Sequence, residues 1–116
     1  MKLITHKNTW WWGTSYTIIT DNGKATIELD ITTDRPDCGY IRSLMVHKSV
    51  RREGIGNALL MFVEDKARKL RLEQVYLTCR KNTFLVDWYQ RCGYTIYDEN
   101  VEEFKGQTVA MYKYLD

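Results

Sequence analysis

A short basic segment between two apolar stretches carries the clearest chemistry in the sequence. It reads Arg51-Arg52-Glu53-Gly54-Ile55-Gly56-Asn57-Ala58, and the apolar residues that follow recur at helical spacing. Glycines allow a tight turn and the close approach of a ligand. The first turn of a helix has free N–H groups and partial positive charge, which suits phosphate, and the arginines add full charge. The segment therefore predicts a site for phosphate or diphosphate.

Three phosphate-binding patterns can be compared with this segment. The dinucleotide fingerprint requires a third glycine where Leu59 stands, so that match is incomplete. The P-loop requires Gly-Lys-Ser/Thr, but Asn57 and Ala58 follow Gly56. The third pattern, Arg/Gln-x-x-Gly-x-Gly/Ala, is matched at Arg51, Gly54 and Gly56. A glycine-rich helix start with solvated arginines is the alternative that remains open.

A second segment with chemical potential begins at Asn82. Tyr89 follows seven residues later, and Gly93-Tyr94 comes after it. We expect a helix from Asn82 to Cys92, with Gly93 as the left-handed residue that ends it. Tyr89 on this helix is either a core aromatic or a phenol that donates a proton in a reaction.

The elements expected before the basic segment are three antiparallel strands. Their hairpin turn is Asp21-Asn22-Gly23-Lys24, because Asn-Gly accepts positive φ at both central positions. In one strand apolar and polar residues alternate, which predicts one buried and one solvated face. The strands are Ser15 to Thr20, Ala25 to Thr33 and Gly39 to His47. The alternating residues are Ile27, Leu29 and Ile31 against Glu28, Asp30 and Thr32.

After the basic segment we expect a helix from Gly54 to about Leu72 and a strand from Gln74 to Arg80. A strand–helix–strand crossover makes the strands on either side of the helix parallel. Two closing strands are expected at Tyr94 to Tyr97 and Thr108 to Tyr114. The first helix is amphipathic: the predicted buried face is Ile55, Leu59, Phe62, Val63 and Leu70, and the solvated face is Glu64, Asp65, Arg68 and Lys69.

Two stretches lie outside these elements. Trp10-Trp11-Trp12 is interpreted as edge-strand aromatics that cover the core, with an exposed patch at a subunit interface or acceptor pocket as the alternative. The acidic residues from Asp98 to Glu103 are interpreted as a solvated connection, with a cation-binding role as the alternative.

Length and composition predict a single domain over residues 1–116. The net charge of +2 is not concentrated in one part of the chain, so we expect no nucleic-acid partner. No apolar run approaches the roughly 20 residues of a membrane span, and no signal peptide is visible. Cys38, Cys79 and Cys92 are scattered; buried thiols in a reducing cytosol are expected, with a catalytic cysteine as the alternative.

The two motifs together, from about Gly39 to Tyr94, resemble the GNAT superfamily of acyl-CoA-dependent N-acetyltransferases. The second motif is similar to that family's Asn-x6-Tyr-x3-Gly-Phe/Tyr segment. The resemblance implies a mixed α/β (α+β) fold, with antiparallel N-terminal strands, a parallel pair around the central helix and two main helices. Acetyl-CoA is then the expected co-substrate, an amine of a small molecule or protein the acceptor, and no metal is expected.

Roles for individual residues follow from this resemblance. The backbone of Leu44 to Val46 pairs with the pantetheine arm, and the N–H of Val46 faces the thioester oxygen. Asn82 hydrogen-bonds the arm, and Tyr89 protonates the leaving thiolate. The complete set of expected cofactor-binding residues is Leu44, Met45, Val46, Arg51, Arg52, Glu53, Gly54, Ile55, Gly56, Asn57, Asn82 and Tyr89. Tyr89 is the expected catalytic residue.

The resemblance also implies direct attack of an amine on acetyl-CoA in a ternary complex. Transfer of another acyl group, or a non-catalytic acyl-CoA-binding or protein-interaction module, are the alternatives. The base that deprotonates the amine is left open between Glu28, Asp30, His47 and water.

The family usually has one strand and two helices before its hairpin, which wall the acceptor site. Met1 to Ser15 are too few for these elements, so we expect a trimmed member with an open acceptor side. A homodimer partner or the tryptophan run could supply the wall, or the acceptor could be large enough to need none.

Overall fold

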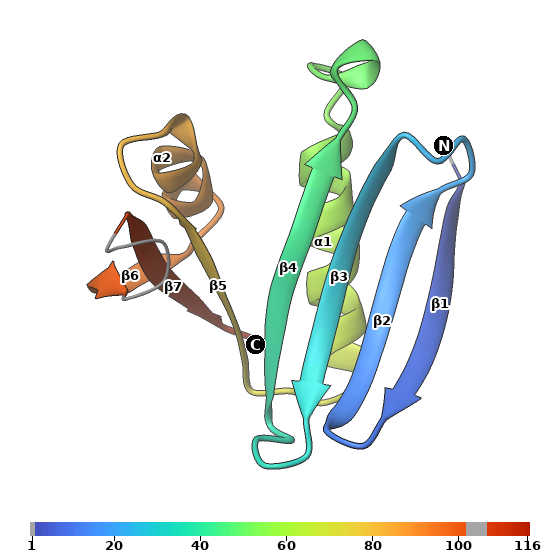
Figure 1. The fold of residues 1–116 in the computed structure, drawn as a ribbon, viewed down its shortest axis with the longest axis vertical. Coiled ribbons are helices and arrows are strands. Elements are labelled where there is room, and N and C mark those ends of the chain that lie inside the picture. The colour runs from blue at the N-terminus through green and yellow to red at the C-terminus, as the bar shows by residue number, and fades with distance from the viewer. Residues whose placement is uncertain (1, 102–106) are drawn as a thin grey trace.

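The computed structural model describes residues 2–101 and 107–116, and Figure 1 shows their arrangement. Neither of its two α-helices is long and apolar enough to cross a membrane, as far as the described residues go. The strands are β1 (Leu3–Trp10), β2 (Gly13–Thr20), β3 (Ala25–Thr32), β4 (Cys38–Val46), β5 (Gln74–Arg80), β6 (Thr95–Val101) and β7 (Thr108–Tyr114); the helices are a 3₁₀ turn (Lys48–Val50), α1 (Ile55–Lys69) and α2 (Phe84–Arg91).

The strands form one seven-stranded sheet in the order β1-β2-β3-β4-β5-β7-β6. Strands β1 to β4 pair antiparallel in sequence order. Strand β4 pairs parallel with β5 across the α1 crossover, and β7 pairs antiparallel with both β5 and β6. The predicted mixed sheet with two main helices is therefore confirmed.

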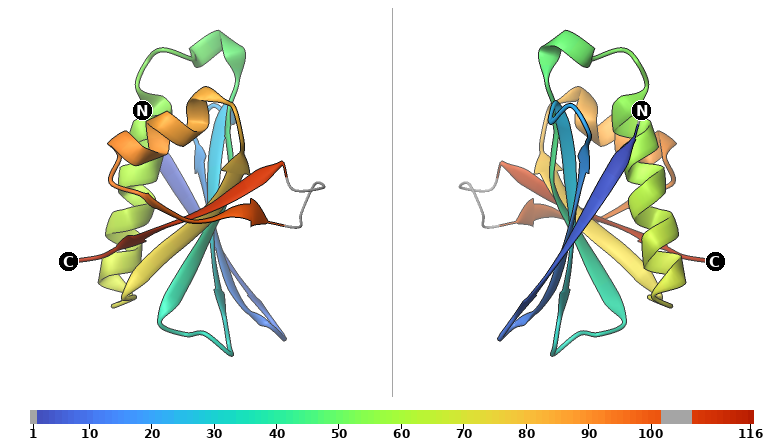
Figure 2. Two further views of the ribbon diagram at one scale, coloured as in Figure 1. Left: turned by 90° about the vertical axis from the view of Figure 1, so that its left-hand side faces the viewer. Right: turned by 90° about the vertical axis from the view of Figure 1, so that its right-hand side faces the viewer.

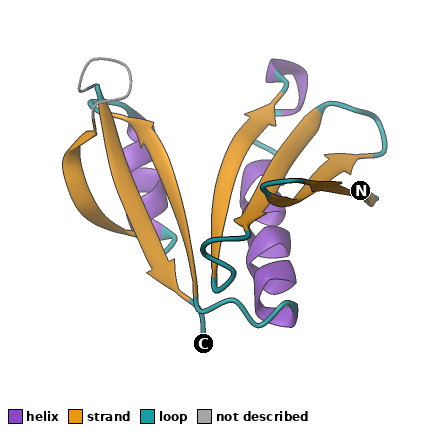
Figure 3. Ribbon diagram, turned by 60° about the horizontal axis from the view of Figure 1, so that its bottom comes forward, coloured by secondary structure: helices purple, strands orange, loops and turns teal. Residues whose placement is uncertain are grey.

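The parallel contact between β4 and β5 is short. It joins Cys38–Tyr40 to Gln74–Tyr76, although β4 continues to Val46 and β5 to Arg80. Beyond the contact the two strands diverge, so that the β1–β4 half with α1 separates from the β5–β7 half with α2 (Figure 3). The divergence leaves the inner edge of each strand without a neighbouring strand at its carboxyl end.

Both helices lie on the same face of the sheet (Figure 2). Helix α1 buries Leu59, Leu60 and Val63 at 1% exposure or less. Burial of each such side chain contributes about 1.5–3 kcal/mol, and the apolar residues of both helices and the sheet join one core cluster. The core thereby fixes the two helices on either side of the opening between β4 and β5.

The N-terminal part of the sheet differs from the prediction. Four antiparallel strands precede the basic segment instead of three, because β1 pairs with β2 from Leu3 opposite Thr20 to Trp10 opposite Gly13. Trp10 stacks on Trp12 at 6.5 Å, but Trp10 and Trp11 are 51% and 92% exposed. The expectation that these aromatics cover the core is wrong, because they lie at the end of an edge strand and in its turn.

Element boundaries also differ. Helices α1 and α2 are shorter than predicted, and β6 extends to Val101. Asp98 therefore lies in a strand, where its pairing with Ala110 involves a register shift. Residues 98–101 therefore belong to a strand and not to a connection, although Asp98 and Glu99 are exposed as predicted; residues 102–103 lie outside the described residues.

Two predicted faces contain polar residues that prove to be buried. Glu64 is 5% exposed, whereas Phe62 is 37% exposed, so the predicted faces of α1 are wrong at both positions. Asp30 is 7% exposed, so the strand from Ala25 has no fully solvated face. Each carboxylate is buried because cationic and hydroxyl side chains from other strands or loops bind it.

Candidate functional site

The basic segment forms a loop that leads from β4 into α1. Two residues in this loop are left-handed, Arg52 with φ of 69° and Gly54 with φ of 75°. Gly54 is the N-cap of α1, and its carbonyl accepts the helix's first hydrogen bond, from Ala58 at 3.1 Å. No side chain caps this end of the helix. The predicted helix start is confirmed, one residue later than the sequence indicated.

The backbone N–H groups of this loop are available to a ligand. Within the described part of the chain, none of the N–H groups of residues 52–57 donates to a protein acceptor. Left-handed residues turn successive N–H groups toward one concave side, and the helix dipole adds positive charge there. Six consecutive donors beside a helix N-terminus suit this loop to binding an anion such as a diphosphate.

The two arginines and His47 have different surroundings. Arg51 Nε donates to the carbonyl of Val46 at 3.0 Å, so this side chain folds back onto the end of β4. Arg52 is exposed. His47 Nδ1 accepts from the backbone N–H of Ser49 at 3.1 Å and caps the 3₁₀ turn. One ring nitrogen of His47, the residue considered from the sequence as a base, is thus engaged in a capping bond.

The free edge of β4 presents backbone groups toward β5. The N–H of His47 donates to the carbonyl of Lys24 on the β3 side at 2.7 Å. Because alternate residues of an antiparallel strand point their N–H and C=O groups to opposite sides, those of Val46 point away from β3. The N–H of Val46 therefore faces the opening between β4 and β5.

A β-bulge lies just before this edge. The β3–β4 register shifts between Thr26 and Glu28, and Ser43 is left-handed with φ of 58°. A bulge inserts one residue and resets the alternation of faces. Leu44 consequently packs against the core together with Val46, which keeps the end of β4 anchored where it borders the opening.

Tyr89 lies on α2 across the opening from β4. It is 6% exposed and is held between two rings, Trp88 at 4.9 Å and Tyr94 at 5.6 Å between centroids. Burial raises the pKa of the Tyr89 phenol above its usual value. The phenol therefore stays protonated through neutral and mildly alkaline pH, which a proton donor requires.

The ring of Trp88 brings α2 close to the N-terminus of α1. A Cβ placed on Gly56 would lie 3.8 Å from Val46 Cγ2 and 3.9 Å from Trp88 Cζ2. The end of β4, the first turn of α1 and α2 therefore meet at one point. The structure brings together three of the sequence-predicted parts of the site: the strand edge, the glycine loop and the helix that carries Tyr89.

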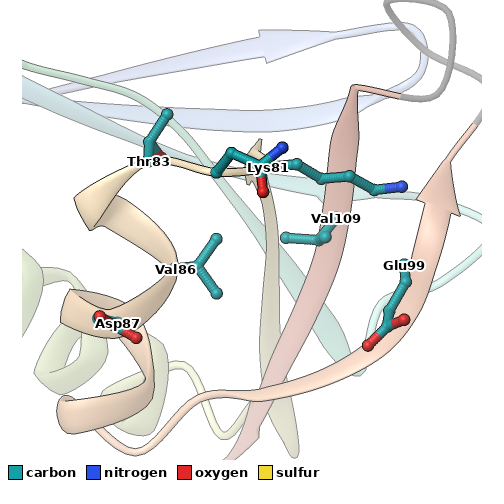
Figure 4. A pocket seen from close by; sticks show the side chains of 7 residues that line it. Lys81, Thr83, Val86, Asp87, Glu99 and Val109 are labelled. Atoms are coloured by element: carbon teal, nitrogen blue, oxygen red, sulfur yellow. The ribbon is translucent and has the colours of Figure 1, made fainter.

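Asn82 is placed differently from the other predicted residues. It is exposed and left-handed with φ of 56°. It lines a hollow of about 380 Å³ between α2 and strands β6 and β7 (Figure 4). A second hollow is bordered by Asp87, Gln90 and Arg91. Neither hollow includes the loop from Arg51 to Asn57, in which Arg51 to Gly54 are exposed.

The two carboxylates considered as bases lie on the face of the sheet opposite the helices. Arg42 bridges Asp30 and Glu28, each at 2.5 Å. Ser15 also donates to Asp30, and Thr17 to Glu28, both at 2.9 Å. These donors occupy both carboxylates in a structural network, so neither is a free proton acceptor in this arrangement.

The fold and this site define a class of α/β protein with free backbone N–H groups at a helix N-terminus beside two splayed parallel strands. The sequence profile of the Acetyltransferase (GNAT) family matches residues 5–94. The chain belongs to that family. Part of the chain, 59 residues or 50% of it, is 42% identical to GCN5-related N-acetyltransferase 6, chloroplastic, of Arabidopsis thaliana, and covers 20% of that protein.

Solved structures share the fold. An acetyltransferase of Bacillus subtilis in complex with CoA superposes with a TM-score of 0.74 at 21% identity, over 99% of each chain. N-acetylglutamate synthase of Neisseria gonorrhoeae, complexed with coenzyme A and N-acetyl-glutamate, gives a TM-score of 0.69 at 19% identity, over 88% of this chain and 26% of that one.

Sequence reasoning missed the ring that packs on Tyr89 and the buried carboxylate that accepts a hydrogen bond from the Tyr94 hydroxyl. Trp88 was predicted only as part of the helix, and Glu64 was predicted to be solvated. Glu64 stands four residues after the buried Leu60 and three before the buried Ala67, so helical spacing was the one signal available. Its partner Lys113 lies 49 residues away in the sequence, and no local pattern connects the two.

Proposed function

We propose that the chain binds acetyl-CoA and transfers its acetyl group to an amine. The observation that carries this proposal is the meeting of three features at one point: six free backbone donors, the unpaired edge of β4, and the helix of Tyr89. Family membership supports an acyl-CoA co-substrate, and the CoA-bound structures of the same fold agree with it.

The co-substrate would use these features in order along its length. Its diphosphate accepts hydrogen bonds from the N–H groups of residues 52–57, with Arg52 adding charge. Its pantetheine arm runs beside Leu44 to Val46 as an added strand, because the β4 edge offers unpaired backbone groups there. Asn82, at the end of β5, is the remaining residue assigned to the arm.

The reaction would form a C–N bond and break the thioester C–S bond. The neutral amine attacks the carbonyl carbon, and the N–H of Val46 stabilises the negative charge on the carbonyl oxygen. Tyr89 donates its proton to the thiolate as CoA leaves. The proton lost by the amine passes to water, since Arg42 holds Glu28 and Asp30 and a capping bond engages His47 Nδ1.

The amine would reach the thioester from the face of the sheet opposite the helices. No helix covers that face in the described part of the chain (Figure 2), and Met45 on it is 66% exposed. An uncovered face accommodates either a small amine or an amine on a protein.

The test is acetyl transfer to a panel of amines, followed through the release of free thiol. Native protein should turn over at least one amine, and Tyr89→Phe should lose most of that turnover while binding CoA with unchanged affinity. Tight CoA binding without turnover on any amine would instead support a non-catalytic acyl-CoA-binding module, which the engagement of Glu28 and Asp30 by Arg42 favours. Absence of CoA binding would exclude both functions.

A further inference from the structure

A polar cluster centred on the buried carboxylate of Glu64 lies beside Tyr94, whose ring packs on Tyr89. The Glu64 carboxylate of α1 accepts a hydrogen bond from the Tyr94 hydroxyl at 2.8 Å and an ion pair from Lys113 Nζ at 2.9 Å. Lys113 Nζ also donates to the carbonyl of Cys92 at 2.9 Å. The cluster therefore joins α1, the end of α2 and β7, and the proposed reaction does not use it directly.

The end of α2 connects this cluster to Tyr89. Gly93 is left-handed with φ of 99°, and Gly93 N–H donates to the carbonyl of Gln90 at 3.0 Å. Tyr94 N–H donates to the carbonyl of Tyr89 at 3.0 Å. These two bonds form a Schellman motif, which usually includes a side-chain contact between the two residues of its longer bond. Here that contact is the edge-to-face packing of Tyr94 on Tyr89.

We propose that Glu64 is a positioning residue, which fixes the Tyr89 phenol beside the thioester through the Tyr94 hydroxyl. Glu64 lies on α1, and the first turn of α1 would hold the diphosphate. One helix would therefore position both the diphosphate of the co-substrate and, through Glu64, the phenol that protonates its sulfur. Lys113 compensates the charge of the carboxylate, because an unpaired buried carboxylate is strongly unfavourable. The inference rests on the proposed function, since it assigns Tyr89 the role of proton donor.

A double-mutant cycle in kcat tests this role. The variants are Tyr89→Phe, Tyr94→Phe and the pair, with Tyr16→Phe as the matched control, a buried tyrosine of β2 at 7% exposure. Tyr94→Phe keeps the ring that packs on Tyr89 and removes only the hydroxyl. It should lower kcat at least tenfold in the native background, leave the affinity for CoA unchanged, and have no further effect in the Tyr89→Phe background. Tyr16→Phe should leave kcat unchanged.

Other outcomes overturn the inference in distinguishable ways. An unchanged kcat in Tyr94→Phe, or an equal loss in both backgrounds, contradicts a role that acts through Tyr89, while the proposed function stands if Tyr89→Phe is impaired. A fully active Tyr89→Phe removes the proposed role of Tyr89 and the inference with it. Circular dichroism and thermal melting establish that each variant is folded. If Tyr94→Phe does not fold, the paired replacement Glu64→Met with Lys113→Met takes its place in the same cycle, because it removes the acceptor of the Tyr94 hydroxyl without leaving an unpaired buried charge; the expected pattern is the same.

Discussion

The most informative perturbation is Gly54→Ala, because the hairpin turn supplies a matched control at Gly23. The two glycines have φ of 75° and 74°, and a Cβ on either would meet no protein atom within 4 Å. Each substitution therefore adds the same backbone strain, about 1–2 kcal/mol, without a steric clash. The two variants should lose about the same free energy of unfolding if they retain the native backbone.

Their effects on CoA binding should differ. At Gly54 the strain acts on the loop that presents the free N–H groups, so relaxation of the strain misaligns those donors. If the binding free energy decreases by the whole strain energy of about 1–2 kcal/mol, the affinity for CoA falls by about 5- to 30-fold. The added methyl group in the open space where the diphosphate would lie lowers it further. Gly23→Ala, in the turn between β2 and β3, should bind CoA as the native protein does.

Isothermal titration calorimetry with CoA, alongside urea unfolding of both variants, makes the comparison. Equal CoA affinity in native protein and Gly54→Ala, at a stability loss matching that of Gly23→Ala, would refute the assignment of this loop to the diphosphate. A similar loss of affinity in both variants would show that stability alone governs binding.

The buried side chains also set the pH dependence of the reaction and the stability of the fold. Because burial raises the pKa of Tyr89, the phenol stays protonated, and the kcat of the native enzyme should not fall from its deprotonation up to pH about 10. The kcat of Tyr89→Phe should be about 10²–10⁴-fold lower at every pH. Arg42→Met should reduce the free energy of unfolding in urea by about 1–3 kcal/mol, because Asp30 loses its ion pair, and the affinity for CoA measured by calorimetry should not change. Leu59→Ala should lower the free energy of unfolding by about 2–5 kcal/mol, since Leu59 is completely buried; a loss below 1 kcal/mol would mean that α1 is not packed on the sheet as described.

Much of the fold could be predicted because its signals are local. The Asn22-Gly23 turn, the alternation from Ala25, the helix start at Gly54 and the helix stop at Gly93 each depend on a few adjacent residues. The structure confirms the turn, the strand and both helix ends as elements, although of the two central turn residues only Gly23 has positive φ and the buried Asp30 interrupts the solvated face of the strand. Strand β1 was predicted only at Trp10, as an edge-strand aromatic; Leu3 to Thr9 has weak alternation, and its pairing with β2 is a tertiary contact.

The parts of the site that could not be predicted depend on contacts between distant segments. The bulge at Ser43 reorients the end of β4, but a left-handed serine has no sequence signature. Glu64 was assigned to the wrong face of its helix, because burial of a carboxylate requires donors that come from residues 94 and 113. The sequence could indicate which residues are chemically useful, but not which of them the splayed strands bring together.

The measurement that tests the central claim most directly is a crystal structure of the protein with CoA bound. We predict that the diphosphate accepts hydrogen bonds from the N–H groups of residues 52–57, that the arm lies along the free edge of β4, and that the sulfur lies within hydrogen-bonding distance of the Tyr89 hydroxyl. A diphosphate bound elsewhere, or a sulfur atom that the Tyr89 hydroxyl cannot reach, would contradict this account.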